Sequence, residues 1–185
     1  MFIFSRSISS NHNACDYLEV IDTVEDVEFD DFRRSLEEGC SVEVYTDGSC
    51  IGNPGPGGWG VVFVFHNKRS SISGFEKETT NNRMELIAAI KAIEAIPNTV
   101  HISIYTDSSY VKNGITSWIK KWQINGWKSS SGSPIKNQDL WMRLSQLIAG
   151  RKIEWDWVKG HADCMNNNNA DFIARSAIVS SYMKS

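Results

Sequence analysis

The order of strand-like and helix-like segments constrains the fold of this chain more than any other feature. From residue 41, three strand patterns come first, and helix and strand patterns then alternate to the end of the chain. The predicted strands are 41–47, 59–66, 70–76, 101–107 and 152–160, and the predicted helices are 82–96, 108–123, 137–150 and 168–183. Three leading strands followed by alternation predict an α/β fold, with a five-stranded mixed sheet flanked by helices.

Charge divides the chain into two parts. Residues 1–40 carry ten acidic residues and three arginines, for a net charge of −7, whereas 41–185 hold 16 basic and 12 acidic residues, for a net charge of +4. We therefore expect an acidic N-terminal extension over 1–40, partly helical or disordered, and one domain over 41–185. The low overall pI does not exclude a polyanionic partner, because the domain itself is basic.

The N-terminus and the cysteines bear on where the protein works. Residues 1–14 lack acids and contain several serines and Arg6, which weakly resembles an organelle-targeting leader, although a frayed terminus explains them as well. No apolar run reaches the roughly 18 residues of a membrane span, so we expect no membrane association. Four cysteines without a C-x-x-C pair favour a reducing compartment such as the cytoplasm, and we expect a monomer.

Four acidic residues occupy the ends of predicted elements. Asp47 and Asp107 each end a strand, whereas Glu85 and Asp171 each lie in the first turn of a helix, at the edge of its buried stripe. Taken singly, each acid is explained by a turn, a helix cap or the helix dipole. Taken together, two parallel strands would bring Asp47 and Asp107 to the edge of the sheet where ligands bind.

Such a group of carboxylates needs a counter-charge. No lysine or arginine directly adjoins any of the four acids in the sequence, so bound cations would have to offset their repulsion. A ligand set made only of oxygen suits Mg²⁺ or Mn²⁺ better than zinc. The residues alone therefore predict a divalent-metal site at this edge of the sheet.

Five stretches of the sequence resemble type 1 ribonucleases H of the bacterial kind. They are YTDGSCIGNPGPGGWG (45–60), TTNNRMELIAAI (79–90), YTDSSYVKNGITSWIKKW (105–122), GWKSSSGSPIKNQDLW (126–141) and WVKGHADCMNNNNADFIA (157–174). These stretches keep the order and spacing of the family and span about three quarters of the chain. The resemblance implies the ribonuclease H-like fold.

The resemblance also implies an activity, which is endonucleolytic hydrolysis of the RNA strand of an RNA–DNA hybrid. Asp47, Glu85, Asp107 and Asp171 match the family's catalytic carboxylates, which hold two Mg²⁺ ions, or Mn²⁺, when substrate is bound. One ion would activate water and the other would stabilise the leaving 3′ oxygen, giving 5′-phosphate and 3′-hydroxyl ends. His161 matches a catalytic loop histidine that assists proton transfer or product release.

Further positions match the family's contacts with the hybrid. One set would read the 2′-hydroxyls of the RNA, and a second, basic and aromatic set would contact the DNA strand. Core packing is the competing explanation for Trp118 and Trp122, which lie four residues apart on one helix. The matching positions are Cys50, Gly52, Asn53, Thr80, Asn81, Asn82, Ser109, Trp118, Lys121, Trp122, Trp127, Lys128 and Lys136.

The chain departs from the family pattern in four places, none of which removes a predicted metal ligand. Residues 123–125 and 129–133 are poor in basic side chains, which predicts weaker, less salt-dependent binding of the hybrid. Ser109 replaces a glutamine, residues 163–165 replace a small loop, and 166–169 lack an acidic residue. The acidic extension would compete for the basic groove or bind a protein partner.

Two other functions fit the same fold. A non-catalytic hybrid-binding module would require a damaged site, and the four carboxylates and His161 are all present. Another nuclease or strand-transfer enzyme of this fold would not need the Asn81-Asn82 pair or the tryptophan-bearing segment. Cleavage of a hybrid, but not of duplex DNA, separates these alternatives.

Overall fold

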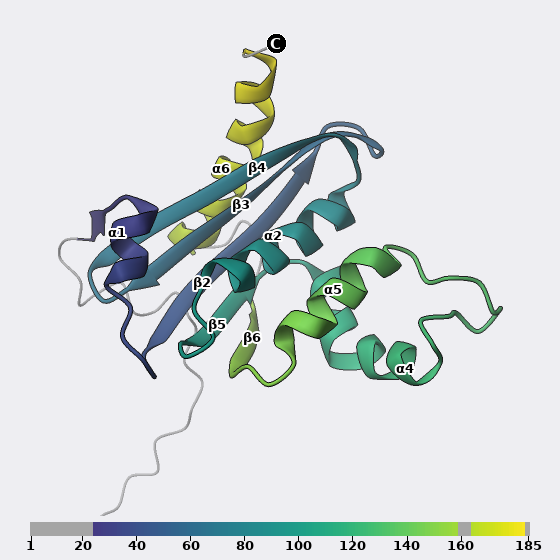
Figure 1. The fold of residues 1–185 in the computed structure, drawn as a ribbon. Coiled ribbons are helices and arrows are strands. Elements are labelled where there is room, and N and C mark those ends of the chain that lie inside the picture. Colours follow the sequence, from purple (N-terminus) through teal and green to yellow (C-terminus); the bar gives the residue numbers. More distant parts are fainter. Residues whose placement is uncertain (1–23, 159–163, 184–185) are drawn as a thin grey trace, which may run out of the picture.

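The computed structural model describes residues 24–158 and 164–183 as one sheet with helices on both faces (Figure 1). The strands are β1 (Glu25–Asp26), β2 (Ser41–Cys50), β3 (Gly55–Phe65), β4 (Lys68–Thr79), β5 (His101–Thr106) and β6 (Ile153–Trp157). The helices are α1 (Phe29–Arg34), α2 (Asn81–Ala95), α3 (Ser109–Asn113), α4 (Ile119–Ile124), α5 (Gln138–Ile148) and α6 (Met165–Tyr182). A π-helical turn, Gly114–Trp118, joins α3 to α4. In this part of the chain, no helix is long and apolar enough to cross a membrane.

The sheet is mixed, as predicted, and has the strand order β1-β4-β3-β2-β5-β6. Strands β2, β3 and β4 are antiparallel neighbours, whereas β5 lies parallel to β2 and β6 parallel to β5. The predicted number of five strands is wrong, because β1 adds a sixth by pairing parallel with the start of β4. A strand of two acidic residues carries no alternation of apolar and polar side chains, so its pattern did not predict it.

The helices cover the two faces of the sheet in separate layers. Alternation along β2 directs Val42 and Val44 towards α2, where they join the main core, and Tyr45 towards α6, where it joins a second, smaller core. Helix α2 packs on β2 and β3, and α6 packs on β2, β3 and β4 (Figure 1). The chain therefore places one long helix on each side of β2, the central strand that carries Asp47.

The described part of the acidic extension packs on the domain. Phe32 of α1 is fully buried in the main core, and its ring centroid lies 5.9 Å from that of Phe63 on β3. Phe29 approaches the same ring at 5.1 Å. The extension over 1–40 was expected to be partly helical or disordered, and its described residues form one helix, α1. Residues 1–23, which include the leader-like residues 1–14, lie outside the described residues. Residues 24–36 thus contribute apolar side chains to the core while their acids face outward.

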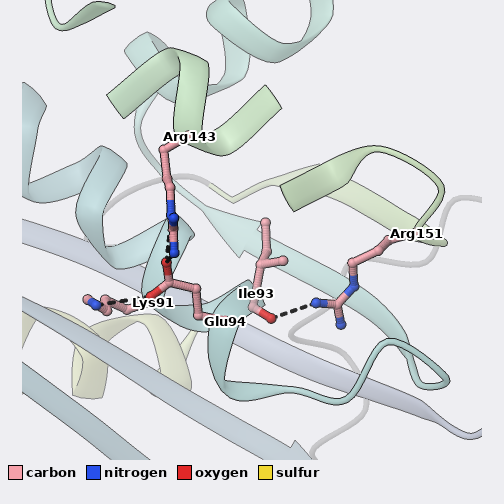
Figure 2. Close-up of polar contacts among 5 residues, drawn as sticks. All are labelled: Lys91, Ile93, Glu94, Arg143 and Arg151. Atoms are coloured by element: carbon pink, nitrogen blue, oxygen red, sulfur yellow. Dashed lines mark hydrogen bonds and ion pairs between the residues drawn. The ribbon is translucent and has the colours of Figure 1, made fainter. Parts of the chain in front are cut away.

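Ion pairs and a half-buried arginine fix α5 and the following loop against α2. Arg83 donates two hydrogen bonds to Asp139, at 3.0 and 2.8 Å, and Arg143 binds Glu94 near the other end of α2. Arg151 donates to the carbonyls of Ile93, Ile96 and Pro97 at 2.7–3.0 Å. Figure 2 shows Arg143 and Lys91 meeting Glu94, and Arg151 reaching the carbonyl of Ile93. Arg151 therefore satisfies carbonyls that the end of α2 leaves without partners.

Candidate active site

Parallel pairing of β2 and β5 brings Asp47 and Asp107 to one edge of the sheet. The ladder between these strands ends at the pair Thr46 and Thr106, so each aspartate is the next residue beyond it. Asp47 was predicted to end its strand, but β2 continues to Cys50 by pairing with β3. The expected juxtaposition of the two acids nevertheless holds, because it depends on the β2–β5 register alone.

Close contact between β2 and α2 adds Glu85 to this pair. A Cβ atom on Gly48 would lie 2.3 Å from the backbone nitrogen of Glu85, so only glycine permits this approach. Asp47, Glu85 and Asp107 each offer a carboxylate oxygen, and these three oxygens lie within 4.8 Å of one another. Three acids that are distant in the sequence thus form one compact carboxylate group.

Burial and mutual repulsion make this group unfavourable when all its members are charged. Asp47 and Glu85 are each 8% exposed. Burial, followed by the charge of Asp107, raises the pKa of Asp47 to about 7. Burial, followed by the charges of Asp47 and Asp107, raises the pKa of Glu85 well above its usual value. A cation bound between them would favour the ionised forms.

The hydrogen bonds around the group leave room for a cation. The side-chain amide of Asn81 donates to Oε1 of Glu85 at 3.1 Å, and the Gly48 N–H donates to Oδ1 of Asp47 at 2.7 Å. Oε2 of Glu85 is buried and has no hydrogen-bond partner among the described residues. A buried carboxylate oxygen without a donor, beside two further carboxylates, fits a hard divalent cation.

Asp171, the fourth predicted ligand, lies outside this compact group. It is on α6, which approaches β3 closely: a Cβ on Gly60 would lie 2.4 Å from the carbonyl oxygen of Ala170. Helix α6 starts at Met165, three residues earlier than predicted, so Asp171 is in its second turn. Its carboxylate accepts a hydrogen bond from Arg175 at 2.7 Å, yet its charge contributes to raising the pKa of Asp47.

The positions expected to read the RNA strand gather beside the carboxylates. The side chain of Asn53 accepts from the Asn81 N–H at 3.2 Å, which joins the turn after β2 to the start of α2. The sulfur of Cys50 lies 3.5 Å from the carbonyl of Gly55 in the same turn. Gly52 adopts a positive φ of 76° in this turn. Thr80 is at the N-cap position of α2, where its side chain makes no capping hydrogen bond, and Asn82 is in the first turn of this helix. Ser109 is exposed at the start of α3, two residues from Asp107.

The tryptophans predicted to contact DNA form a second group around α4. The ring centroids of Trp118 and Trp122 lie 5.5 Å apart, and Trp122 contacts the buried Trp141 at 5.4 Å. Trp122 and Trp127 pack against the main core, so packing accounts for part of their burial. Gly114 permits the close approach of Trp141, since a Cβ there would lie 1.8 Å from its ring.

The other positions predicted to contact DNA are lysines. Lys121, Lys128 and Lys136 are all exposed. The predicted catalytic residue His161 lies outside the described residues.

Two residues near the carboxylates were not predicted from the sequence. Arg175 lies four residues after Asp171, a spacing that indicates an ion pair on any helix and could have identified it. The indole of Trp157 donates to the backbone carbonyl of Asp107 at 3.0 Å. No local pattern indicates this second contact, because it joins the end of β6 to the residue that follows β5.

Comparison with known proteins identifies the family. The model of the RNase H family matches residues 39–179 of this chain. The chain is 52% identical over 138 residues to a ribonuclease H of Parvibaculum lavamentivorans, covering 75% of this chain and 92% of that protein. It is 54% identical to a ribonuclease H of Ehrlichia ruminantium, covering 75% and 94%. The crystal structure of LC9-RNase H1, a type 1 RNase H with the type 2 active-site motif, matches with a TM-score of 0.69 at 36% identity, covering 79% of this chain and 75% of that one. The chain therefore belongs to the ribonuclease H family.

Proposed function

We propose that this protein hydrolyses the RNA strand of RNA–DNA hybrids and leaves 5′-phosphate and 3′-hydroxyl ends. The observation that carries the proposal is the compact group of Asp47, Glu85 and Asp107 in a chain of this family. A non-catalytic binding protein would have no need to keep three repelling carboxylates together.

Asp47, Glu85 and Asp107 would hold divalent cations, with Asp171 completing the set on release from Arg175. When bound, two such ions supply water activation and stabilisation of the leaving oxygen. We favour Mg²⁺, because all of the ligands are carboxylate oxygens. Asn81 orients Glu85 through the hydrogen bond to Oε1, and His161 would carry a proton to or from the reacting groups.

Recognition of the hybrid would use the two groups of residues that flank the carboxylates. Backbone and amide groups of the Asn53 and Asn81 pair would contact RNA 2′-hydroxyls, which distinguish RNA from DNA. The exposed Lys121 and Lys128 would contact DNA phosphates, and the half-buried Trp118 and Trp122 would present ring edges to the DNA sugars.

The proposal is tested with four labelled substrates of one sequence: the RNA–DNA hybrid, duplex RNA, duplex DNA and single-stranded RNA. With Mg²⁺, we expect cleavage of the hybrid alone and 5′-phosphate product ends. With excess chelator, we expect no cleavage and recovery when Mg²⁺ is added back.

Two results would contradict this assignment. Cleavage of duplex DNA would indicate another nuclease of the same fold. Binding of the hybrid without hydrolysis, in Mg²⁺ and in Mn²⁺, would indicate a binding module. The matched negative control is Glu85→Gln, which removes a charge from the carboxylate group and keeps the side-chain shape.

A further inference from the structure

The backbone that carries Asp107 is held by β6 from outside the carboxylate group. Trp157, the last residue of β6, pairs with Thr106, the last residue of β5. Its indole N–H donates to the backbone carbonyl of Asp107 at 3.0 Å, and the Val158 N–H donates to the carbonyl of Thr106 at 3.1 Å. Two consecutive carbonyls at the end of β5 are therefore bound to β6 and the residue that follows it.

Core packing does not explain the position of Trp157. Ile153 and Trp155 point to the same side of β6, are half-buried and pack against the main core. Trp157 continues that row, yet its side chain is 46% exposed. An exposed indole that served only to bury apolar surface would contribute little to the core here. The hydrogen bond to Asp107 is thus its most specific contact.

Lys112, on helix α3, lies over the ring of Trp157. Nζ of Lys112 lies 4.9 Å from the centroid of the indole, within the range of a cation–π interaction. Lys112 belongs to α3, which begins two residues after Asp107. The indole N–H therefore binds the Asp107 carbonyl, and the face of the ring contacts Lys112 of α3.

This arrangement matters because Asp107 is the least enclosed of the three clustered acids. Asp47 and Glu85 are buried between β2 and α2, whereas Asp107 is half-buried at the point where β5 ends. Repulsion from Asp47 and Glu85 would push this strand end outward before a cation binds. A restraint on its backbone carbonyl opposes that movement and limits the rearrangement required for metal binding.

We propose that Trp157, with Lys112 on its ring, is a positioning residue that holds Asp107 where a divalent cation can bind it. The inference rests on the proposed function of the carboxylate group. It assigns Trp157 and Lys112 the role of supporting the metal-binding site. Neither side chain is a metal ligand.

The test measures metal binding without substrate. Mn²⁺ is titrated calorimetrically into the full chain and into Trp157→Phe, which keeps an aromatic ring and loses the N–H donor. We expect Trp157→Phe to bind Mn²⁺ five- to tenfold more weakly. In hybrid cleavage, its kcat should fall at limiting Mn²⁺ and recover at high Mn²⁺, with KM for the hybrid within twofold of that of the unmodified protein.

Matched variants separate positioning from general packing. Trp155→Phe changes a core-packing tryptophan on the same strand and should lower thermal stability without weakening Mn²⁺ binding. Lys112→Met should weaken Mn²⁺ binding two- to threefold, and Lys112→Arg, which keeps the cation over the ring, should restore it. If Trp157→Phe does not fold, the comparison of Lys112→Met with Lys112→Arg tests the positioning role.

Several results would overturn the inference. Unchanged Mn²⁺ affinity in Trp157→Phe refutes it, and a raised KM with unchanged Mn²⁺ affinity would make Trp157 a substrate contact instead. The proposed function fails separately, when the unmodified protein neither binds Mn²⁺ nor cleaves the hybrid. An unmodified protein that binds and cleaves, beside Trp157→Phe with the same affinity, leaves the function intact and rejects the positioning role alone.

Discussion

Arg175 holds the carboxylate of Asp171 through a hydrogen bond of 2.7 Å between its Nε and Oδ1, one turn apart on α6. The pair lies close enough to Asp47 to act on it: the charge of Asp171 raises the pKa of Asp47, and the charge of Arg175 lowers it. Asp171 therefore has a cationic partner in the absence of metal. A divalent ion bound at Oδ1 of Asp171 would compete with Arg175 for that oxygen.

We predict that Arg175→Gln strengthens the binding of divalent cations. The substitution removes a positive charge near the carboxylate group and frees Asp171. Because Arg175 is exposed, solvent screens the pair, and we expect a gain of only about two- to threefold in affinity. Calorimetric titration of Mg²⁺ checks this, with Arg175→Lys as the matched control, which should retain the affinity of the unmodified protein. Weaker binding in Arg175→Gln would mean that the arginine orders Asp171 for the metal.

Asp47→Asn should abolish turnover and leave hybrid binding largely intact. Asp47 belongs to the compact group, and its neutral replacement removes a ligand charge without changing shape. The same change should stabilise the metal-free protein at pH 8 by on the order of 2 kcal/mol, since a buried charge among like charges is lost. Urea unfolding in chelator measures this, with Glu154→Gln at an exposed position of β6 as control. Loss of folding in Asp47→Asn would instead assign the acid a structural role.

The metal-free protein should lose stability as the pH rises from 5 to 8. The pKa of Asp47 is about 7 in the folded protein and near 3.8 when unfolded, so the folded state binds more protons between these values. Glu85 shifts in the same direction. Acids with a lowered pKa, such as Asp139, are ionised in both states above pH 5 and do not contribute to this slope. Unfolding in chelator at four pH values measures the trend, and saturating Mg²⁺ should abolish it.

The outline of the fold and the identity of the acids could be predicted because both leave local patterns. The alternation along β2 and the stripe of α2 place Asp47 and Glu85 on known elements, and parallel pairing brings Asp107 beside Asp47. Strand β1 and the contact of Trp157 with Asp107 could not be predicted, because both depend on which segments meet in space. The pairing of Asp171 with Arg175 follows from helical spacing, but whether an acid binds a cation or an arginine depends on its surroundings.

Replacing Arg151 should destabilise the domain without changing the active site. Its guanidinium donates to three carbonyls at the end of α2, of which Figure 2 shows that of Ile93. Arg151→Met leaves these carbonyls without their charged donor, so we expect a loss of about 2–3 kcal/mol in the free energy of unfolding. Urea unfolding measures the loss, and Lys91→Gln, at an exposed ion pair near the same helix end, should change stability by less than about 0.5 kcal/mol. Equal effects of the two variants would contradict this explanation.

Two truncations should separate the parts of the acidic extension. Removal of residues 1–40 takes Phe32 out of the main core, so we expect a loss of about 3–5 kcal/mol in the free energy of unfolding. Removal of 1–23 leaves β1 and α1 in place and should change stability by less than about 1 kcal/mol. Thermal and urea unfolding measure both. Equal stability of the two truncated proteins would show that α1 does not contribute to the core.

The same proteins test whether the extension screens the hybrid-binding groove. The described acids of β1 and α1 lie at the sheet edge opposite β6, away from α3 and its neighbour α4 (Figure 1). These described acids are therefore badly placed to screen the groove, and removal of residues 1–23 is the change that tests screening. Tighter binding of the hybrid at low salt after this truncation, with an affinity that then falls more steeply as salt rises, supports screening by the terminal segment. Unchanged affinity at low salt rules that out, because electrostatic competition is strongest where counter-ions are fewest.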